Sequence, residues 1–259
     1  LAREQLADAK IRAAAAAATA GVAPPLVAGL AITPLTRSFV HTVETLPAKA
    51  GELVMMTYAT GGVRDLVQNW VLHIQRLHVS VVAIAMDDVL VKQCTEQQFD
   101  CLDWSSSRAA KDAIYVRGDE SGFRALGVRK VDALLAVLRA GIHVVLSDVD
   151  CVWSADPTDM VLGRVSQYRS FAEADVLVST DCMDPSDDVR RHGCFSDSID
   201  KNTGIMAIKP SADGIATMAE WRVRLAVGQL NEQDQTTFMD LIDGHGRGHR
   251  WGMSPAQRG

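Results

Sequence analysis

The sequence predicts an α/β domain built on a mostly parallel central sheet that is flanked by helices. Three observations support this class. Continuous apolar runs, of which residues 142–146 are the clearest, are typical of strands buried on both faces. From Glu52 onward these runs alternate with segments whose apolar residues follow helical spacing. Glycines and other small residues separate the two kinds of segment, as turns require.

The first half of the domain is expected to contain two buried strands with a helix between them. Residues 53–57 form the first strand, which ends in a small-residue turn, and residues 79–85 form the second. The helix between them carries an apolar stripe made of Val63, Leu66, Val67, Trp70, Val71, Ile74 and Leu77. Residues 91–120 are polar, and we expect them to be irregular apart from a short strand at 113–116.

The second half is expected to begin with a helix that places Val131, Leu134, Leu135 and Leu138 on one stripe. Gly141 is a typical C-cap for this helix, and the strand at 142–146 follows at once. The remaining elements are a helix starting at 156–158, strands at 175–179 and 203–208, a helix capped by Ser211, and a last helix from about residue 231. Residues 180–200 form a long acidic loop between the last two strands.

Composition narrows the functional classes. The 259 residues carry a formal net charge of −6, which argues against general binding of nucleic acid. A protein this acidic needs local cations, either a metal or placed Lys and Arg, if its substrate is a polyanion. Residues 12–32 are rich in alanine, but Pro24 and Pro25 interrupt them, so residues 1–50 are expected to form a helix and linker rather than a membrane span. The chain begins at Leu1, and any membrane anchor is expected upstream of it.

The five cysteines show no C-x-x-C spacing of the kind that metal sites use. Cys94 and Cys101 bracket one polar loop, and Cys182 and Cys194 bracket another, so two disulfides would form in a secretory compartment. Five reduced cysteines in a cytosolic protein are an equally good reading of the composition. Cys151 is expected to be a buried free thiol.

The most informative segment is residues 142–153, in which the apolar run ends in Asp148 and Asp150. Open α/β sheets bind ligands beyond the carboxyl ends of their strands, where these aspartates would lie. If the extended geometry continues, both carboxylates point the same way while Val149 faces the packing. Two hard oxygen ligands suit Mn²⁺ or Mg²⁺, and such a cation shares its other positions with water and phosphates. The alternative is an acidic turn that only caps the next element.

Two later clusters contain chemically useful side chains. Lys201-Asn202-Thr203-Gly204 opens a strand, although Asn and Gly are also ordinary turn residues. Residues 231–235 begin a helix, where Asn231 could be an N-cap and an acidic residue suits the helix dipole. Asp234, however, shares a helical face with apolar residues at i+4 and i+7. A carboxylate at the head of a buried stripe faces inward and needs a partner.

In this order, the motifs resemble nucleotide-diphospho-sugar transferases of glycosyltransferase family 77, plant and algal enzymes related to the retaining family 8. These enzymes have the GT-A fold, a single Rossmann-like domain, which residues 51–259 would form. The resemblance covers about residues 52–245. The matching motifs are M-M-T-Y-A-T-G-G, Asn69-Trp70, a helix with Lys130, L-S-D-V-D-C-V-W with Asp156-Pro157, Ser179-Thr180-Asp181, N-T-G and D-Q-T-T-F.

The resemblance implies a role for each matching position. Asp148 and Asp150 would bind Mn²⁺, or Mg²⁺, and the nucleotide diphosphate. Thr57, Tyr58 and Ala59 would lie along the nucleotide, and Lys130 would reach the phosphate or the sugar of the donor. Without the resemblance, Lys130 reads as a solvated helix lysine. The residues expected around the donor sugar are Asn202, Thr203, Gly204, Asp234 and Gln235, with Asn202, Asp234 and Gln235 nearest the reacting carbon.

The resemblance also implies a reaction and a location. The enzyme would be a retaining hexosyl- or pentosyltransferase that moves a sugar, mostly from a UDP-sugar, to a glycan or glycoprotein acceptor, such as a cell-wall polysaccharide. It would act in the Golgi lumen as a type II single-pass membrane protein. A histidine nearer the C-terminus would complete the metal shell. His245 and His249 are available, but their glycine-rich surroundings do not match. We therefore expect the domain to be cut short at its C-terminus, or the gene to be divergent.

Two other functions are open. Phosphatases of the haloacid dehalogenase type also place D-x-D after a buried strand, but on their earliest strand, whereas here other strands precede it. A non-catalytic module that binds nucleotide sugars is the second alternative, and it is favoured by the abrupt C-terminus.

Overall fold

The computed structural model describes residues 38–105, 120–180, 201–227 and 234–242. The described elements belong to a compact unit, Ser38–Gly259. Most of the expected N-terminal helix and linker lies outside the described residues, as do the strand expected at 113–116, nearly all of the acidic loop and Asn231. The folded unit begins before residue 51, because the strand at Val40–His41 already pairs within the sheet.

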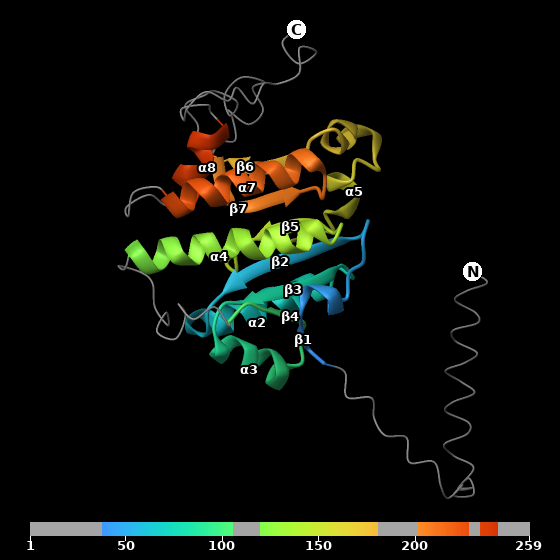
Figure 1. The fold of residues 1–259 in the computed structure, drawn as a ribbon. Coiled ribbons are helices and arrows are strands. Elements are labelled where there is room, and N and C mark those ends of the chain that lie inside the picture. The colour runs from blue at the N-terminus through green and yellow to red at the C-terminus, as the bar shows by residue number, and fades with distance from the viewer. Residues whose placement is uncertain (1–37, 106–119, 181–200, 228–233, 243–259) are drawn as a thin grey trace, which may run out of the picture. The chain divides into compact units, whose positions relative to one another are not determined.

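The core of the unit is a seven-stranded sheet with the order β1-β4-β3-β2-β5-β7-β6 (Figure 1). The strands are β1 (Val40–His41), β2 (Leu53–Ala59), β3 (Ser80–Ala85), β4 (Cys101–Asp103), β5 (His143–Ser147), β6 (Val176–Thr180) and β7 (Lys201–Ile208). From β1 to β5 all neighbours pair in parallel, while β7 is antiparallel to both β5 and β6. The predicted class, a mostly parallel α/β sheet flanked by helices, is therefore confirmed.

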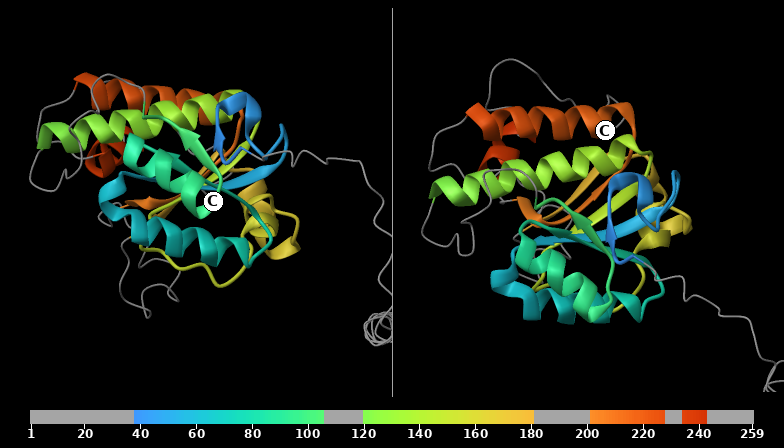
Figure 2. Two further views of the ribbon diagram at one scale, coloured as in Figure 1. Left: turned by 90° about the horizontal axis from the view of Figure 1, so that it is seen from below. Right: turned by 60° about the horizontal axis from the view of Figure 1, so that its bottom comes forward.

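Helices cover both faces of this sheet, as Figure 2 shows. One face carries α2 (Arg64–Gln75) and α3 (Asp88–Gln97), and the other carries α4 (Glu120–Arg139), α7 (Ala212–Val227) and α8 (Asp234–Ile242). The short helix α5 (Thr158–Val161) follows β5, and 3-10 helices lie at Val43–Thr45, Gly61–Val63 and Ser166–Ala172. Two apolar cores result, one on each side of the sheet, as expected for strands without a polar face.

Local signals account for most of the boundaries. Gly141 ends α4 in the left-handed conformation with φ 81°, as its position as C-cap predicts. The Ser211 hydroxyl accepts a hydrogen bond of 3.0 Å from the Gly214 amide and so caps α7. Asp156 accepts one of 2.8 Å from the amide of Thr158, where α5 begins. These three predictions are confirmed.

The prediction that residues 91–120 are irregular is wrong for its first part, which contains α3 and β4. Asp87 caps α3 by accepting a hydrogen bond of 2.9 Å from the Leu90 amide. Leu90, Gln93 and Cys94 are buried at helical spacing, a pattern diluted by the polar residues around it. Three-residue β4 is too short for a periodic signal of its own. A disulfide joins Cys94 of α3 to Cys101 of β4, while Cys182 and Cys194 lie outside the described residues.

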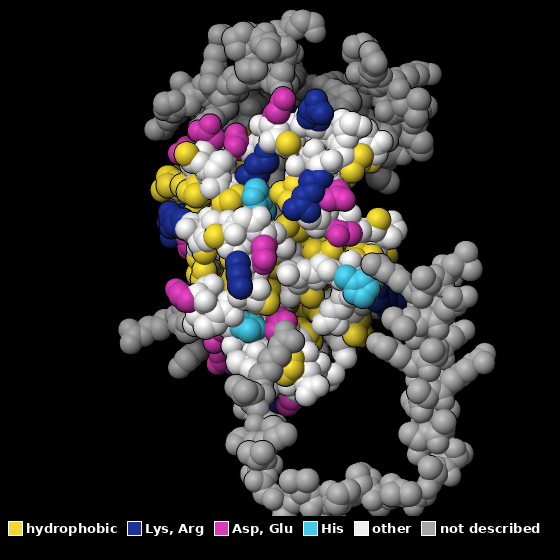
Figure 3. Space-filling model, turned by 90° about the vertical axis from the view of Figure 1, so that its right-hand side faces the viewer, with side chains coloured by type: hydrophobic (Ala, Val, Ile, Leu, Met, Phe, Trp, Pro, Cys, Tyr) yellow, Lys and Arg dark blue, Asp and Glu magenta, His cyan; other side chains and the backbone are white. Residues whose placement is uncertain are grey.

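The surface is mixed in charge. On the face seen in Figure 3, lysine and arginine side chains are interspersed with aspartate and glutamate rather than gathered by sign. Within the described residues, no helix is long and apolar enough to span a membrane.

Candidate functional site at the carboxyl edge of the sheet

The predicted site residues meet where β2 and β5 end and antiparallel β7 begins. The Asp148 amide, directly after β5, donates a hydrogen bond of 2.7 Å to the carbonyl of Gly204 in β7. The side-chain oxygen of Asn202 accepts one of 2.7 Å from the Gly204 amide. This pairing joins the D-x-D and N-T-G motifs, which are far apart in the sequence.

The two aspartates lie on a turn rather than on an extension of the strand. The Cys151 amide donates to the Asp148 carbonyl at 3.2 Å, which closes the aspartate turn (residues 148–151). The expected extended geometry is therefore wrong, although Val149 does pack against the apolar core as predicted. Asp148 is half-buried and Asp150 is exposed. Cys151 is a free thiol, but it is only partly buried.

The pKa of Asp148 reflects its burial and the charges around it. Burial raises the pKa of Asp148, Lys130 opposes this shift, and the charges of Asp150 and Asp234 raise the pKa further. A group of like charges that is partly removed from water gains from a bound cation, so the turn suits a divalent metal.

Gly204 is the residue that lets the Asp148 carboxylate lie against β7. A Cβ at this position would lie 2.6 Å from Oδ2 of Asp148 and 2.7 Å from the side-chain oxygen of Asn202. Both distances are far inside van der Waals contact. A larger residue here would force the Asp148 and Asn202 side chains to move.

Behind the turn, Lys130 of α4 forms a buried ion pair with Asp234 of α8. Only 1% of the Lys130 side chain and 11% of the Asp234 side chain are exposed. Burial lowers the pKa of Lys130, but Asp234 and Tyr58 outweigh it, and the net pKa lies above the ordinary value. Burial likewise raises the pKa of Asp234, but Lys130 outweighs it and the net pKa is lowered.

This pair settles two predictions. Asp234 faces inward and has a charged partner, as the stripe on its helix predicted. The reading of Lys130 as a solvated surface lysine is wrong. Its ammonium group lies 4.8 Å from the centre of the Tyr58 ring and 5.1 Å from that of Trp221, so two aromatic faces add to its binding.

The three residues near the end of β2 differ in their exposure. Tyr58 is half-buried, and burial raises its pKa to about 12, with Lys130 opposing the shift and the charges of Asp234 and Asp148 adding to it. The side chain of Thr57 has no exposed surface, and its hydroxyl has no hydrogen-bond partner in the part of the chain that the structure describes. Ala59 is also buried. Of these three, only Tyr58 joins the charged cluster with its side chain.

Gln235 connects α8 to β7. Its side-chain oxygen accepts a hydrogen bond of 3.3 Å from the Thr203 amide. The indole N–H of Trp221 donates at 3.0 Å to the carbonyl of Asp234, which fixes the start of the same helix. The D-Q motif is thereby held beside N-T-G.

One cation at this edge is absent from the predicted set. Arg129 is 8% exposed and donates from Nη2 to the carbonyls of Met86, at 2.7 Å, and of Trp104. These carbonyls follow β3 and β4, so Arg129 satisfies groups that the strand ends leave free. Burial lowers its pKa, and Asp87 opposes the shift. Arg129 and its neighbour Lys130 lie on the same helix, and no pattern in the sequence shows that both side chains are buried.

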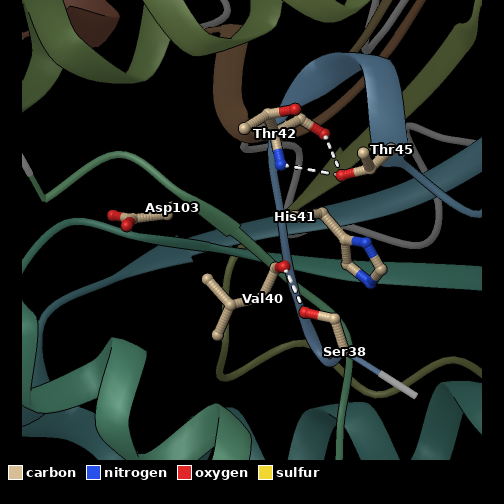
Figure 4. A pocket seen from close by; sticks show the side chains of 6 residues that line it. All are labelled: Ser38, Val40, His41, Thr42, Thr45 and Asp103. Atoms are coloured by element: carbon tan, nitrogen blue, oxygen red, sulfur yellow. Dashed lines mark hydrogen bonds between the residues drawn. The ribbon is translucent and has the colours of Figure 1, made fainter. Parts of the chain in front are cut away.

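Figure 4 shows a separate cavity of about 500 Å³ at the edge strand β1. It is lined by Ser38, Val40, His41, Thr42, Thr45 and Asp103, none of which belongs to the predicted site. Nε2 of His41 lies 2.8 Å from Oδ1 of Asp100.

Asp148 and Asp150 are the predicted metal ligands that lie in the described residues, and no group of three or more His, Cys, Asp or Glu side chains in that part of the chain is placed to hold an ion. His245 and His249 lie outside the described residues. Two carboxylates on an open turn fit a hard cation that keeps several positions for water and phosphate oxygens.

Fold and site together define an α/β protein with an acidic, partly exposed turn at the carboxyl edge of its sheet, the edge at which open α/β sheets bind ligands. A family model described as nucleotide-diphospho-sugar transferase matches residues 76–251. The chain belongs to this family, which makes it a glycosyltransferase by descent and removes the phosphatase alternative. The match includes the aspartate turn, the N-T-G strand and Asp234, and it begins after Tyr58. No curated protein matches the chain.

Proposed function

We propose that the chain is a metal-dependent retaining glycosyltransferase of family 77 that uses a UDP-sugar as donor. The observation that carries the proposal is the convergence of the aspartate turn, the N-T-G strand and the Lys130–Asp234 pair at one edge of the sheet. Together they supply acidic groups for a metal ion, amide groups for the sugar and a cationic group for the negative charge of a sugar diphosphate.

Asp148 and Asp150 would hold Mn²⁺ or Mg²⁺. When bound, the cation would neutralise charge that develops on the departing diphosphate. The protein groups around it have separate tasks. Lys130 places a fixed positive charge close enough to lower the pKa of Asp148, so it offsets negative charge at the same edge.

The sugar passes through an oxocarbenium-like state as the diphosphate leaves. Asn202 and Gln235 would contribute amide groups around this sugar, since both flank the start of β7. Asp234 would act chiefly by holding Lys130, because its own carboxylate is buried and already paired.

That burial also favours a second candidate, a non-catalytic module that binds nucleotide sugars. Asp234 in its paired state offers no free carboxylate to the reacting carbon. Such a module would bind UDP with Mn²⁺ and turn over no donor.

The proposed acceptors are glycans or glycoproteins of the cell wall, and the proposed location is the Golgi lumen, with a membrane anchor outside residues 1–259. The Cys94–Cys101 disulfide supports this, because disulfides persist in oxidising compartments.

The test is a screen of nucleotide sugars for hydrolysis or transfer with Mn²⁺, with and without EDTA. Wild type should turn over at least one donor, EDTA should abolish turnover, and Asp150→Ala should do the same. Asp159→Ala is the matched control, since the side chain of Asp159 lies in an exposed pair with Arg164, outside the aspartate turn. Turnover that needs no metal, or full activity of Asp150→Ala, would overturn the mechanism. Binding of UDP without turnover of any donor would establish the second candidate.

A further inference from the structure

Ser147, the last residue of β5, lies directly before the aspartate turn and is fully buried. Its hydroxyl accepts a hydrogen bond of 2.9 Å from the indole N–H of Trp153 and one of 3.2 Å from that of Trp70. The same hydroxyl donates to the Asp148 carbonyl at 3.2 Å. A hydroxyl has one donor and two acceptor positions, and all three are used.

These bonds join parts of the molecule that the sequence separates. Trp70 belongs to α2 and is 1% exposed, so its ring is fixed in the core. Trp153 follows the turn and packs partly against the same apolar cluster. Ser147 therefore connects a core helix, the end of β5, the first residue of the aspartate turn and the segment that follows the turn.

The Asp148 carbonyl is the point at which this network meets the turn. It accepts from the Ser147 hydroxyl and also from the Cys151 amide, the bond that closes the turn. Rotating the Asp148 carbonyl to another direction would break both bonds. It would also leave two indole N–H groups pointing at a hydroxyl without its own acceptor, and buried polar groups resist that state.

We infer that Ser147, Trp70 and Trp153 are positioning residues that hold the aspartate turn in the form that presents Asp148 and Asp150 to a divalent cation. The inference rests on the proposed function, because it assigns these residues a role in the metal site of that function. Partners behind a metal ligand commonly set the ligand's orientation, and their loss weakens metal binding about 10–100-fold.

The variants separate hydrogen bonding from packing. Ser147→Ala removes the shared hydroxyl, while Trp153→Phe removes one N–H donor and keeps a ring in a partly exposed position. Trp153→Phe is the safer variant for folding. Ile74→Val is the control, because Ile74 is buried on α2 in the same core but has no bond to Ser147. It should lower the Tm and leave metal binding unchanged.

The measurements are the Kd for Mn²⁺ in the presence of UDP, from the electron paramagnetic resonance signal of free Mn²⁺, and the hydrogen-exchange rate of the Cys151 amide. Ser147→Ala should raise the Kd about tenfold or more and speed the exchange, and Trp153→Phe should do both to a smaller extent. The amide readout needs no metal.

The outcomes distinguish the two claims. If Asp150→Ala weakens Mn²⁺ binding but Ser147→Ala and Trp153→Phe leave both the Kd and the Cys151 exchange at wild-type values, the inference is wrong and the proposed function stands. If wild type binds Mn²⁺ no better than Asp150→Ala, the proposed function fails, and the inference falls with it.

Discussion

Replacing Lys130 by methionine tests whether the buried pair organises the site. Methionine keeps an unbranched side chain of similar length but removes the charge. Asp234, whose carbonyl is bonded to the Trp221 indole, would then remain buried without a cation. Breaking a buried pair in this way is expected to lower the free energy of unfolding by about 3–5 kcal/mol. That is a large part of the roughly 5–15 kcal/mol that stabilises a typical domain.

Two further variants show whether the loss of stability comes from the unpaired charge of Asp234. Lys130→Met combined with Asp234→Leu removes both charges, and it should recover most of the stability because no unpaired charge is left. Lys92→Met is the control, since the Lys92–Glu96 pair is 3.6 Å apart with side chains 77% and 57% exposed. That variant should change the stability by no more than about 1 kcal/mol.

The effect should depend on pH in a defined direction. In wild type the pKa of Asp234 is lowered, so its contribution is present above the ordinary carboxyl pKa and is lost as the pH falls through the lower, folded value. The pKa of Lys130 is raised, so its contribution is present below the ordinary amine pKa and is lost as the pH rises through the folded value. In Lys130→Met, burial should raise the pKa of Asp234. The stability difference between wild type and variant should therefore shrink towards acidic pH, as Asp234 becomes protonated in the variant.

Urea unfolding followed by fluorescence at several pH values measures these quantities, and a double-mutant cycle isolates the coupling. A loss of less than about 1 kcal/mol for Lys130→Met, equal to that of Lys92→Met, would refute the reasoning. So would a difference that grows as the pH falls.

Two other predictions concern the site and the fold. Gly204→Ala places a methyl group 2.6 Å from Oδ2 of Asp148, so it should raise the Kd for Mn²⁺ about tenfold or more. The Kd is measured as for the Ser147 variants. An unchanged Kd would show that the Asp148 carboxylate is free to move. Cys101→Ser opens a disulfide between residues seven apart in sequence and should lower the free energy of unfolding, measured by urea titration, by about 2 kcal/mol relative to untreated wild type. Wild type treated with reductant is the control and should be about as stable as the variant. Equal stability of the variant and of untreated wild type would contradict the second prediction.

Local sequence patterns predicted much of the fold because the responsible forces are local. Apolar runs located β2, β3, β5 and β7, since a strand buried on both faces needs no polar side. Gly141 and Ser211 marked helix ends because their backbone conformation and side-chain hydrogen bonds are set within a few residues. Helix α3 and strand β4 were missed because polar residues dilute the buried positions of α3 and because β4 is too short for a periodic signal.

In the candidate site, too, local patterns predicted some features and packing decided others. Residue types and order indicated Asp148, Asp150, Asn202 and Asp234, and helical spacing alone predicted that Asp234 faces inward. The identity of its partner did not follow, because Lys130 is brought to it only when α4 and α8 pack on the same face of the sheet.

The sequence by itself determined the fold class, the positions of β2, β3, β5 and β7 and the chemistry available at the strand ends, because periodicity and residue type express burial and charge directly. Tertiary structure decided which of those groups meet. It closed residues 148–151 into a turn and brought Trp70 and Trp153 to Ser147. It also removed Lys130 from water. The Trp70–Ser147 and Lys130–Asp234 contacts join elements far apart in the chain, and their energies depend on distances that no local pattern encodes.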